Sequence, residues 1–311
     1  MEEKGQKNLS SLQPLISPLT AAFLALVGVF VLYQIGGSVL TLAIFGFDLK
    51  KADVNAMRLL TVASQLIFIL LPALVLARYV YSDVTTALRV RMPKKIELLY
   101  FLIGLFILIP LLQNYLYLQN YAFVKLSASS SFVASVKEIF DSLDKLVEDA
   151  YGNLLRASNV FEGTFVILVV AVVPAFCEEV LFRGFIQTSL ELKSTAFKGA
   201  LFTALFFGLY HFNPYGLIPL IALGLYFGYA VYSTNSIVTS ITLHFANNFI
   251  SIILFFYLGD SELLDSSVPA PEDVKGILLQ FFLFLIFFSA FIIFIRRIIN
   301  NREKENDLSQ V

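Results

Sequence analysis

Long runs of apolar residues are the feature that most constrains how this chain can fold. A helix needs about 20 mostly apolar residues to cross a membrane. About eight stretches meet or nearly meet that length: 19–45, 59–80, 98–118, 161–187, 197–212, 215–232, 237–257 and 277–299. Hydrophobic residues make up 58% of the 311 residues and charged residues 14%, against roughly 45–50% and 25% in soluble proteins. The chain is predicted to be an all-α polytopic transmembrane helix bundle, and a soluble or disordered protein is excluded.

Charge and cysteine content exclude further classes of protein. The chain has 22 Lys plus Arg and 23 Asp plus Glu, so it has no basic field that would attract nucleic acid. Its one cysteine, Cys177, can form neither an intramolecular disulfide nor a zinc–thiolate site. The first apolar stretch is longer than the core of a signal peptide, so we expect it to remain as the first span.

The distribution of Lys and Arg predicts the orientation, because short loops rich in these residues stay in the cytoplasm. These residues flank the second loop, the fourth loop and the C-terminus: Arg78, Arg89, Arg91, Lys94 and Lys95, then Lys193 and Lys198, then Arg296, Arg297, Arg302 and Lys304. The opposite side would receive the segment 119–159 and the acidic loop with Asp260, Glu262, Asp265, Glu272 and Asp273. With about eight spans, both termini are predicted to be cytoplasmic, in the plasma membrane. Lys50, Lys51 and Arg58 in the first loop fit this orientation less well.

The long loop between the third and fourth spans carries its own helical pattern. Apolar residues recur at helical spacing over residues 132–154, and the other face is acidic. Membrane-surface helices usually favour Lys and Arg instead. The segment is therefore predicted to be an acidic amphipathic helix, either capping the bundle or serving as a lid or docking element.

The fourth span ends in an unusual cluster of charges. Glu178 and Glu179 are adjacent, and Arg183 follows Glu179 at i+4, so those two can pair on a helix. Glu178 points about 100° away from that stripe. An unpaired carboxylate among apolar residues suits a general base. The alternative is a helix-end charge network without chemistry.

Both histidines of the chain lie in apolar stretches. His211 closes the fifth, on a face with small residues that allow close packing, and His244 in the seventh shares a face with Asn248. A lone buried histidine is more often structural than catalytic. Two histidines, an asparagine and a carboxylate on three separate spans instead indicate one polar cavity inside the bundle.

These motifs, taken in order, resemble those of the CAAX-protease and bacteriocin-processing family, which includes the Ras-converting enzymes. They are Glu178-Glu179-x-x-x-Arg183, Phe207-x-x-x-His211 and His244-x-x-x-Asn248. The resemblance implies a catalytic core at 160–258, preceded by N-terminal transmembrane helices and the amphipathic loop helix at 1–159. A final transmembrane helix and cytoplasmic tail would follow at 259–311.

The resemblance also implies an activity, that of an intramembrane endopeptidase acting on a membrane-associated peptide or lipidated protein. Glu178 and His211 would activate a water, and His244 and Asn248 would donate hydrogen bonds to the oxyanion. Glu179, Arg183 and Phe207 match positions that shape the site or position the substrate.

Several alternatives remain open at the level of sequence. Glu178, His211 and His244 could instead hold zinc with an open position for water, although no i, i+4 histidine pair supports this. We favour metal-free activation without a cofactor. Other functional readings are a non-catalytic membrane scaffold or regulator and an ion-coupled transporter with a carboxylate–histidine relay. No internal repeat supports the transporter. Membrane lipid and a membrane-associated peptide or lipidated protein are the expected partners, and nucleic acid is not.

Overall fold

The computed structural model describes residues 12–47, 52–258 and 268–308, and within these ranges the chain is helical. No β-strand occurs there, and Pro14 and Tyr81 form an isolated bridge. The predicted all-α polytopic bundle is confirmed. Of the predicted acidic loop, Asp260, Glu262 and Asp265 lie outside the described residues, as do Lys50 and Lys51.

The predicted spans coincide with the observed helices. In the described ranges, seven helical spans are long and apolar enough to cross a membrane: Pro18–Phe45, Val54–Val80, Lys95–Ser127, Val160–Glu191, Leu217–Thr234, Ile237–Leu258 and Val274–Asn301. The short fifth stretch forms a 15-residue apolar helix, Ala196–Tyr210. The third helix runs nine residues beyond the predicted end at 118, to Ser127. In the extension, the polar side chain of Gln119 has a partner, because its Nε2 donates to the carbonyl oxygen of Tyr215 at 2.9 Å.

The spans are built from the following elements. They are α2 (Pro18–Val31), η1 (Leu32–Gly36), α3 (Gly37–Phe45), α4 (Val54–Gln65), η3 (Leu66–Leu70), α5 (Leu71–Val80), α6 (Val84–Ala87), α7 (Lys95–Ser127), α8 (Ser131–Leu155), α9 (Val160–Ile167), η4 (Leu168–Val172), α10 (Val173–Glu179), η5 (Val180–Gln187), α11 (Thr188–Glu191), α12 (Ala196–Tyr210), α13 (Leu217–Thr234), α14 (Ile237–Leu258) and α16 (Val274–Leu308). The η segments are π-helical insertions, which occur most often at functional sites. Four of them interrupt the first, second and fourth spans.

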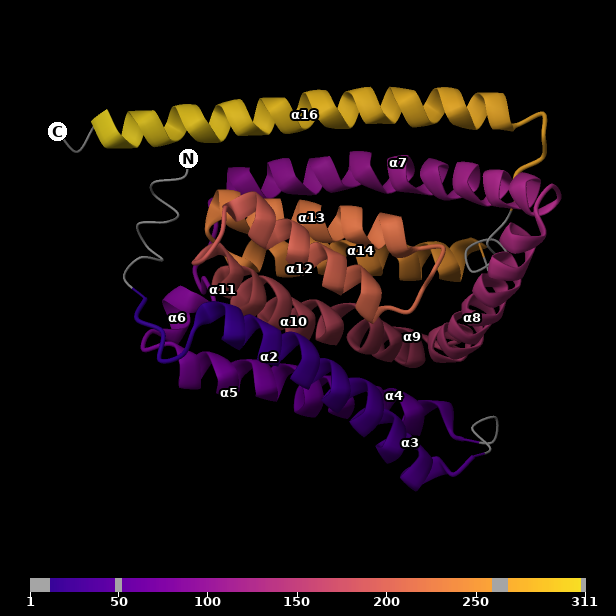
Figure 1. Cartoon of the computed structure of the whole chain (residues 1–311), viewed down its shortest axis with the longest axis horizontal. Helices are drawn as coiled ribbons and strands as arrows, with labels where there is room; N and C mark the ends of the chain where they lie inside the picture. The colour runs from indigo at the N-terminus through magenta and orange to yellow at the C-terminus, as the bar shows by residue number, and fades with distance from the viewer. Residues whose placement is uncertain (1–11, 48–51, 259–267, 309–311) are drawn as a thin grey trace.

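The helices form layers around α10, η5, α12, α13 and α14 (Figure 1). On one side, α2 and α5 pack against η5 in an apolar core that includes Ala25, Ala77 and Phe185. On the other side lies α7, and α16 packs along the outer face of α7 (Figure 1). Residues of the central layer are thus shielded from both sides, which leaves room for polar groups away from lipid.

The loops that are rich in Lys and Arg lie together at one end of the bundle, as the sequence predicts. The loops after α5 and α11 and the C-terminal end of α16 lie at one end of the bundle, on the left in Figure 1. Two of the basic residues are not loop charges, however. Arg89 is buried and paired with Glu191 of α11, and Arg58 is buried and donates to the carbonyl oxygens of Leu154 and Arg156.

These contacts explain why Arg58 fits the predicted distribution of cytoplasmic Lys and Arg poorly. Its guanidinium donates to carbonyl groups where α8 ends, at the opposite end of the bundle from the basic loops after α5 and α11. A positive side chain near the carbonyl end of a helix is also favoured by the helix dipole. The first loop does not need to lie on the same side as the other basic loops.

The predicted amphipathic helix is present as α8, at the end of the bundle opposite the basic loops (Figure 1). Ser130 caps its start by accepting from the backbone N–H of Val133 at 3.4 Å. Phe140 stacks on Phe123 of α7 and contacts Tyr215 of the α12–α13 loop. The helix is thus docked on the bundle by its apolar side, which supports the interpretation of a cap.

Candidate active site

The two adjacent glutamates lie where α10 passes into the π-helical segment η5. Pro174 is the second residue of α10, directly after the π-helical segment η4 and inside the unbroken span Val160–Glu191, where its missing N–H interrupts the helical hydrogen bonds. All eight residues of η5 are buried, from Val180 to Gln187. Glu179 is buried with 0% of its surface exposed, whereas Glu178 is partly exposed. The helix therefore turns one carboxylate into the protein interior and the other toward a different neighbour.

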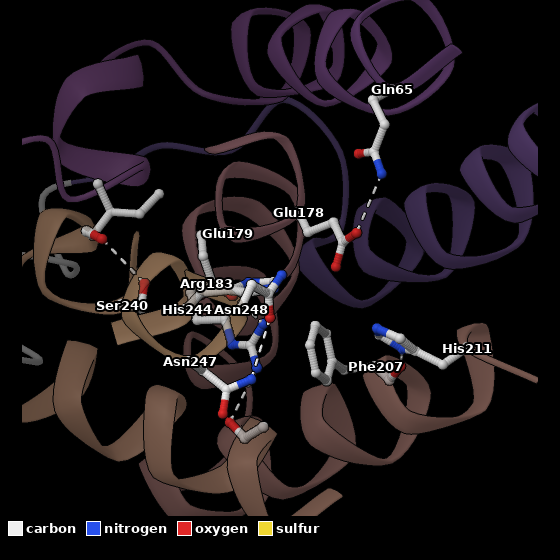
Figure 2. A network of polar contacts seen from close by, with 12 residues as sticks. Gln65, Glu178, Glu179, Arg183, Phe207, His211, Ser240, His244, Asn247 and Asn248 are labelled. Atoms are coloured by element: carbon white, nitrogen blue, oxygen red, sulfur yellow. Dashed lines mark hydrogen bonds and ion pairs between the residues drawn. The ribbon is translucent and has the colours of Figure 1, made fainter. Parts of the chain in front are cut away.

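Glu179 is the centre of a buried polar cluster (Figure 2). Its Oε1 accepts from Nη1 of Arg183 at 2.8 Å and from Nδ1 of His244 at 2.9 Å. The ion pair with Arg183 is the one that their i, i+4 spacing predicts. A buried carboxylate is costly unless it is paired and hydrogen-bonded, and these contacts of Oε1 suit Glu179 to hold its two neighbours in place. Its Oε2 is buried without a hydrogen-bond partner in the described part of the chain.

Arg183 is enclosed by aromatic rings and by helix α13. Its guanidinium carbon lies 4.3 Å from the ring centre of Phe207 and 5.5 Å from that of Phe227, and Nη2 donates to the carbonyl oxygen of Gly224 at 3.2 Å. A Cβ at position 224 would lie 3.1 Å from Ala204 and 3.3 Å from Arg183 Nη2. Glycine here allows α13 to approach both α12 and the arginine.

His211 lies just past the end of α12, on the other side of the Phe207 ring (Figure 2). Its Nδ1 lies 2.6 Å from the carbonyl oxygen of Phe207. Since a carbonyl oxygen only accepts, Nδ1 must carry the proton, and Nε2 of the neutral ring is then an acceptor. Phe212 follows with a φ of 49°, the left-handed conformation in which many helices end, although a large side chain rarely adopts it.

Glu178 faces the second span rather than its own helix. Its Oε1 accepts from Nε2 of Gln65 at 3.4 Å, and Oε2 is buried without a hydrogen-bond partner among the described residues. Figure 2 shows the carboxylate between Gln65 and the region of Phe207 and His211. His211 is close enough to Glu178 and His244 to interact electrostatically with both. The structure thus brings Glu178 and both histidines into one region.

Asn248 lies one helical turn beyond His244 on α14. Its Nδ2 donates to the carbonyl oxygen of Val170 at 2.9 Å, and its Oδ1 accepts from Asn247 at 3.2 Å. An amide nitrogen has two N–H groups, so these contacts orient the side chain and leave a second donor. His244 is fixed as well, because Phe227 stacks on its ring with centres 5.7 Å apart.

Metal ligation is the alternative role for Glu178, His211 and His244. Among the described residues, no group of three or more His, Cys, Asp or Glu side chains is placed to hold a metal ion. In both histidines the hydrogen bond to the protein is made by Nδ1, so Nε2 is the ring nitrogen that could face a metal or a water. The zinc ligand set stays a prediction.

Three elements of the site escaped the sequence reasoning. The sequence marks Gln65 as unusual, since it is an amide in an apolar span, but not its partner Glu178, which is 113 residues away. Phe227 has no signal that distinguishes it from other aromatic residues. The third is a buried chain in which Gln187 donates to Glu191 at 2.7 Å and Glu191 pairs with Arg89.

These features define a class of protein: an integral membrane helix bundle with a carboxylate–histidine–asparagine site among its central helices. Residues 160–250 match the family model described as "Type II CAAX prenyl endopeptidase Rce1-like". The resemblance recognised from the motifs is thus confirmed over this segment, which is similar to the Rce1-like domain of CAAX-type intramembrane proteases. Comparison with curated proteins and with solved structures gives no match.

Proposed function

We propose that this protein is an intramembrane endopeptidase that hydrolyses a peptide bond of a membrane-associated substrate with a water activated by Glu178 and His211. The observation that carries the proposal is the buried Oε2 of Glu178, which has no hydrogen-bond partner in the described ranges and lies in electrostatic range of His211, within the segment that matches the Rce1-like family. A general base must present a free lone pair toward the proton that it takes.

His211 complements Glu178 in this mechanism. With Nδ1–H donated to the carbonyl oxygen of Phe207, Nε2 is the nitrogen left to bind the water. Glu178, as the general base, takes a proton from the water as the water oxygen attacks the carbonyl carbon of the peptide bond. The proton is then delivered to the amide nitrogen when the peptide bond breaks, which balances the hydrolysis.

Asn248 and His244 are the proposed donors to the oxyanion. The second N–H of Asn248 serves directly. His244 already uses its Nδ1–H on Glu179, so its Nε2 carries a proton only when the ring is doubly protonated. The carboxylate of Glu179 would stabilise that imidazolium. One such donor contributes about 3–4 kcal/mol to the transition state in well-studied hydrolases.

The substrate class follows from the position of the site and from the family. A site in the central layer of a membrane bundle receives a chain that is itself held at the membrane, and a prenylated C-terminus meets that condition. We also propose that both termini face the cytoplasm and that the plasma membrane is the site of action, because the basic loops gather at one end of the bundle.

The test is cleavage of a fluorogenic peptide by the purified protein in lipid vesicles. The peptide ends in a farnesylated cysteine followed by three residues, and an unlipidated copy serves as comparison. Wild type should cleave the farnesylated peptide, Glu178→Gln should not, and the exposed carboxylate variant Glu138→Gln should behave as wild type. A metal chelator should leave the rate unchanged.

The outcomes separate the alternatives. Preferential cleavage of the unlipidated peptide would retain the protease and contradict the prenylated substrate. Loss of activity on chelation would contradict metal-free activation. Equal rates for wild type and Glu178→Gln, or no product from either, would contradict the protease and favour a scaffold.

A further inference from the structure

Gln65 is a polar residue in the middle of the second span, outside the matched segment. It is the last residue of α4, immediately before the π-helical segment η3, and only 5% of its surface is exposed. Its Nε2 donates to Oε1 of Glu178 at 3.4 Å across the bundle (Figure 2). A glutamine in a membrane span is costly unless it has a partner or a function.

The position of Gln65 determines what Glu178 can do. Of the two carboxylate oxygens of Glu178, one is bound by the glutamine and the other has no partner among the described residues. A free carboxylate rotates about its side-chain bonds. A donor held on a second helix restricts it to the orientation in which the unbound oxygen is offered to the site.

The other end of the amide adds a second observation. Oε1 of Gln65 is also buried without a hydrogen-bond partner in the described part of the chain. An unsatisfied buried acceptor is costly, and two of them, on Gln65 and Glu178, lie on side chains that already contact each other. Such a pair is what a site needs if it is to receive a donor such as water.

We propose that Gln65 is a positioning residue for the reaction, which orients the carboxylate of Glu178 through a hydrogen bond from the N-terminal helices. This inference rests on the proposed function, because it assigns Gln65 a role only if Glu178 is the base. It makes the active site a joint product of the matched segment and the second span. The 3.4 Å distance leaves room for the bond to shorten when substrate binds, as catalytic hydrogen bonds often do.

The experiment measures kcat and KM for the farnesylated fluorogenic peptide in lipid vesicles, with four variants of the full chain. Gln65→Met keeps the length of the side chain and removes the donor. Gln65→Asn keeps the amide but is one methylene shorter, so the donor no longer reaches Glu178. Ser64→Ala is the matched control, since Ser64 is the neighbouring buried polar residue and lies against Gly37 of α3 instead of the site. Glu178→Gln tests the proposed function itself.

The expected result is a fall in kcat of about 10- to 100-fold for both Gln65 variants, with KM within about twofold of wild type. That factor corresponds to one hydrogen bond to a charged group. Ser64→Ala should match wild type. If position 65 required only a polar side chain, Gln65→Asn would keep the wild-type kcat, and that result would contradict the positioning role.

Other results overturn the inference in distinguishable ways. If Glu178→Gln is inactive while Gln65→Met keeps wild-type kcat, the proposed function stands and the role of Gln65 is wrong. A loss confined to KM, or an equal loss in Ser64→Ala, also contradicts positioning. If Glu178→Gln cleaves as fast as wild type, the proposed function fails and the inference fails with it.

Discussion

Removing the charge of Glu179 should destabilise the protein strongly, because this carboxylate neutralises a fully buried arginine. Both side chains of the Glu179–Arg183 pair have 0% of their surface exposed, and their atoms lie 2.8 Å apart. Removing one partner of a buried pair costs about 3–5 kcal/mol, since the other charge is left without compensation. Because neither side chain is exposed, water does not screen this pair.

The variant Glu179→Gln is therefore expected to lower the free energy of unfolding by about 3–5 kcal/mol, and Arg183→Met by a similar amount. The double variant should cost much less than the sum, because neutral groups of similar volume replace a buried pair at little cost. Reversible denaturation in detergent micelles, followed by circular dichroism, gives all three values. The coupling energy is the difference between the double variant and the sum of the single variants.

The reasoning would be refuted by single variants that each cost less than about 1 kcal/mol and add in the double variant. Such a result is typical of an ion pair that water screens. It would mean that the cluster around Glu179 is open to solvent rather than enclosed between the helices.

Three further predictions concern packing and the cap helix α8. Gly228→Ala should lower the free energy of unfolding by about 1–3 kcal/mol, measured in the same denaturation assay, because the added Cβ would lie 3.1 Å from that of Ala200; an unchanged stability would contradict the close packing of α12 and α13. Arg58→Met should speed cleavage by a protease just after α8, since Arg58 binds the carbonyl oxygens there, and wild-type resistance would contradict that anchor. The pKa of Asp141 is lowered, because the effect of burial, which raises it, is outweighed by the hydrogen bonds from Lys137 and Tyr215. The docking of α8 on the bundle should therefore weaken as the pH falls through this depressed pKa. Amide hydrogen exchange over 131–149, corrected for the intrinsic rate, should then become faster, and Asp141→Asn should remove this pH dependence.

The helices were predictable from the sequence because lipid imposes a simple rule on composition. A span must be apolar over about 20 residues, so each predicted stretch falls on a helix. The ends were less predictable: α7 runs past its apolar part to Ser127, and Gln119 there donates to the carbonyl oxygen of Tyr215, 96 residues away. The π-helical insertions were not predictable either, since they depend on tertiary contacts that composition does not record.

The site was predictable where its partners are close in sequence or rare in type. The pairing of Glu179 with Arg183 follows from helix spacing, and two histidines in apolar spans are conspicuous. The contact of Glu178 with Gln65 and that of His244 with Glu179 join separate spans. They depend on how the helices cross, which no local pattern encodes. The roles of these residues in catalysis stay predictions.

The most direct test of the central claim is whether Glu178 and His211 act as one unit on the water. The measurement is kcat/KM on the farnesylated peptide for Glu178→Gln, His211→Gln and the double variant. Groups that act as a unit are strongly non-additive, so each single variant should lose nearly all activity and the double variant no more. Losses that multiply in the double variant, or a single variant with near wild-type kcat/KM, would contradict the account.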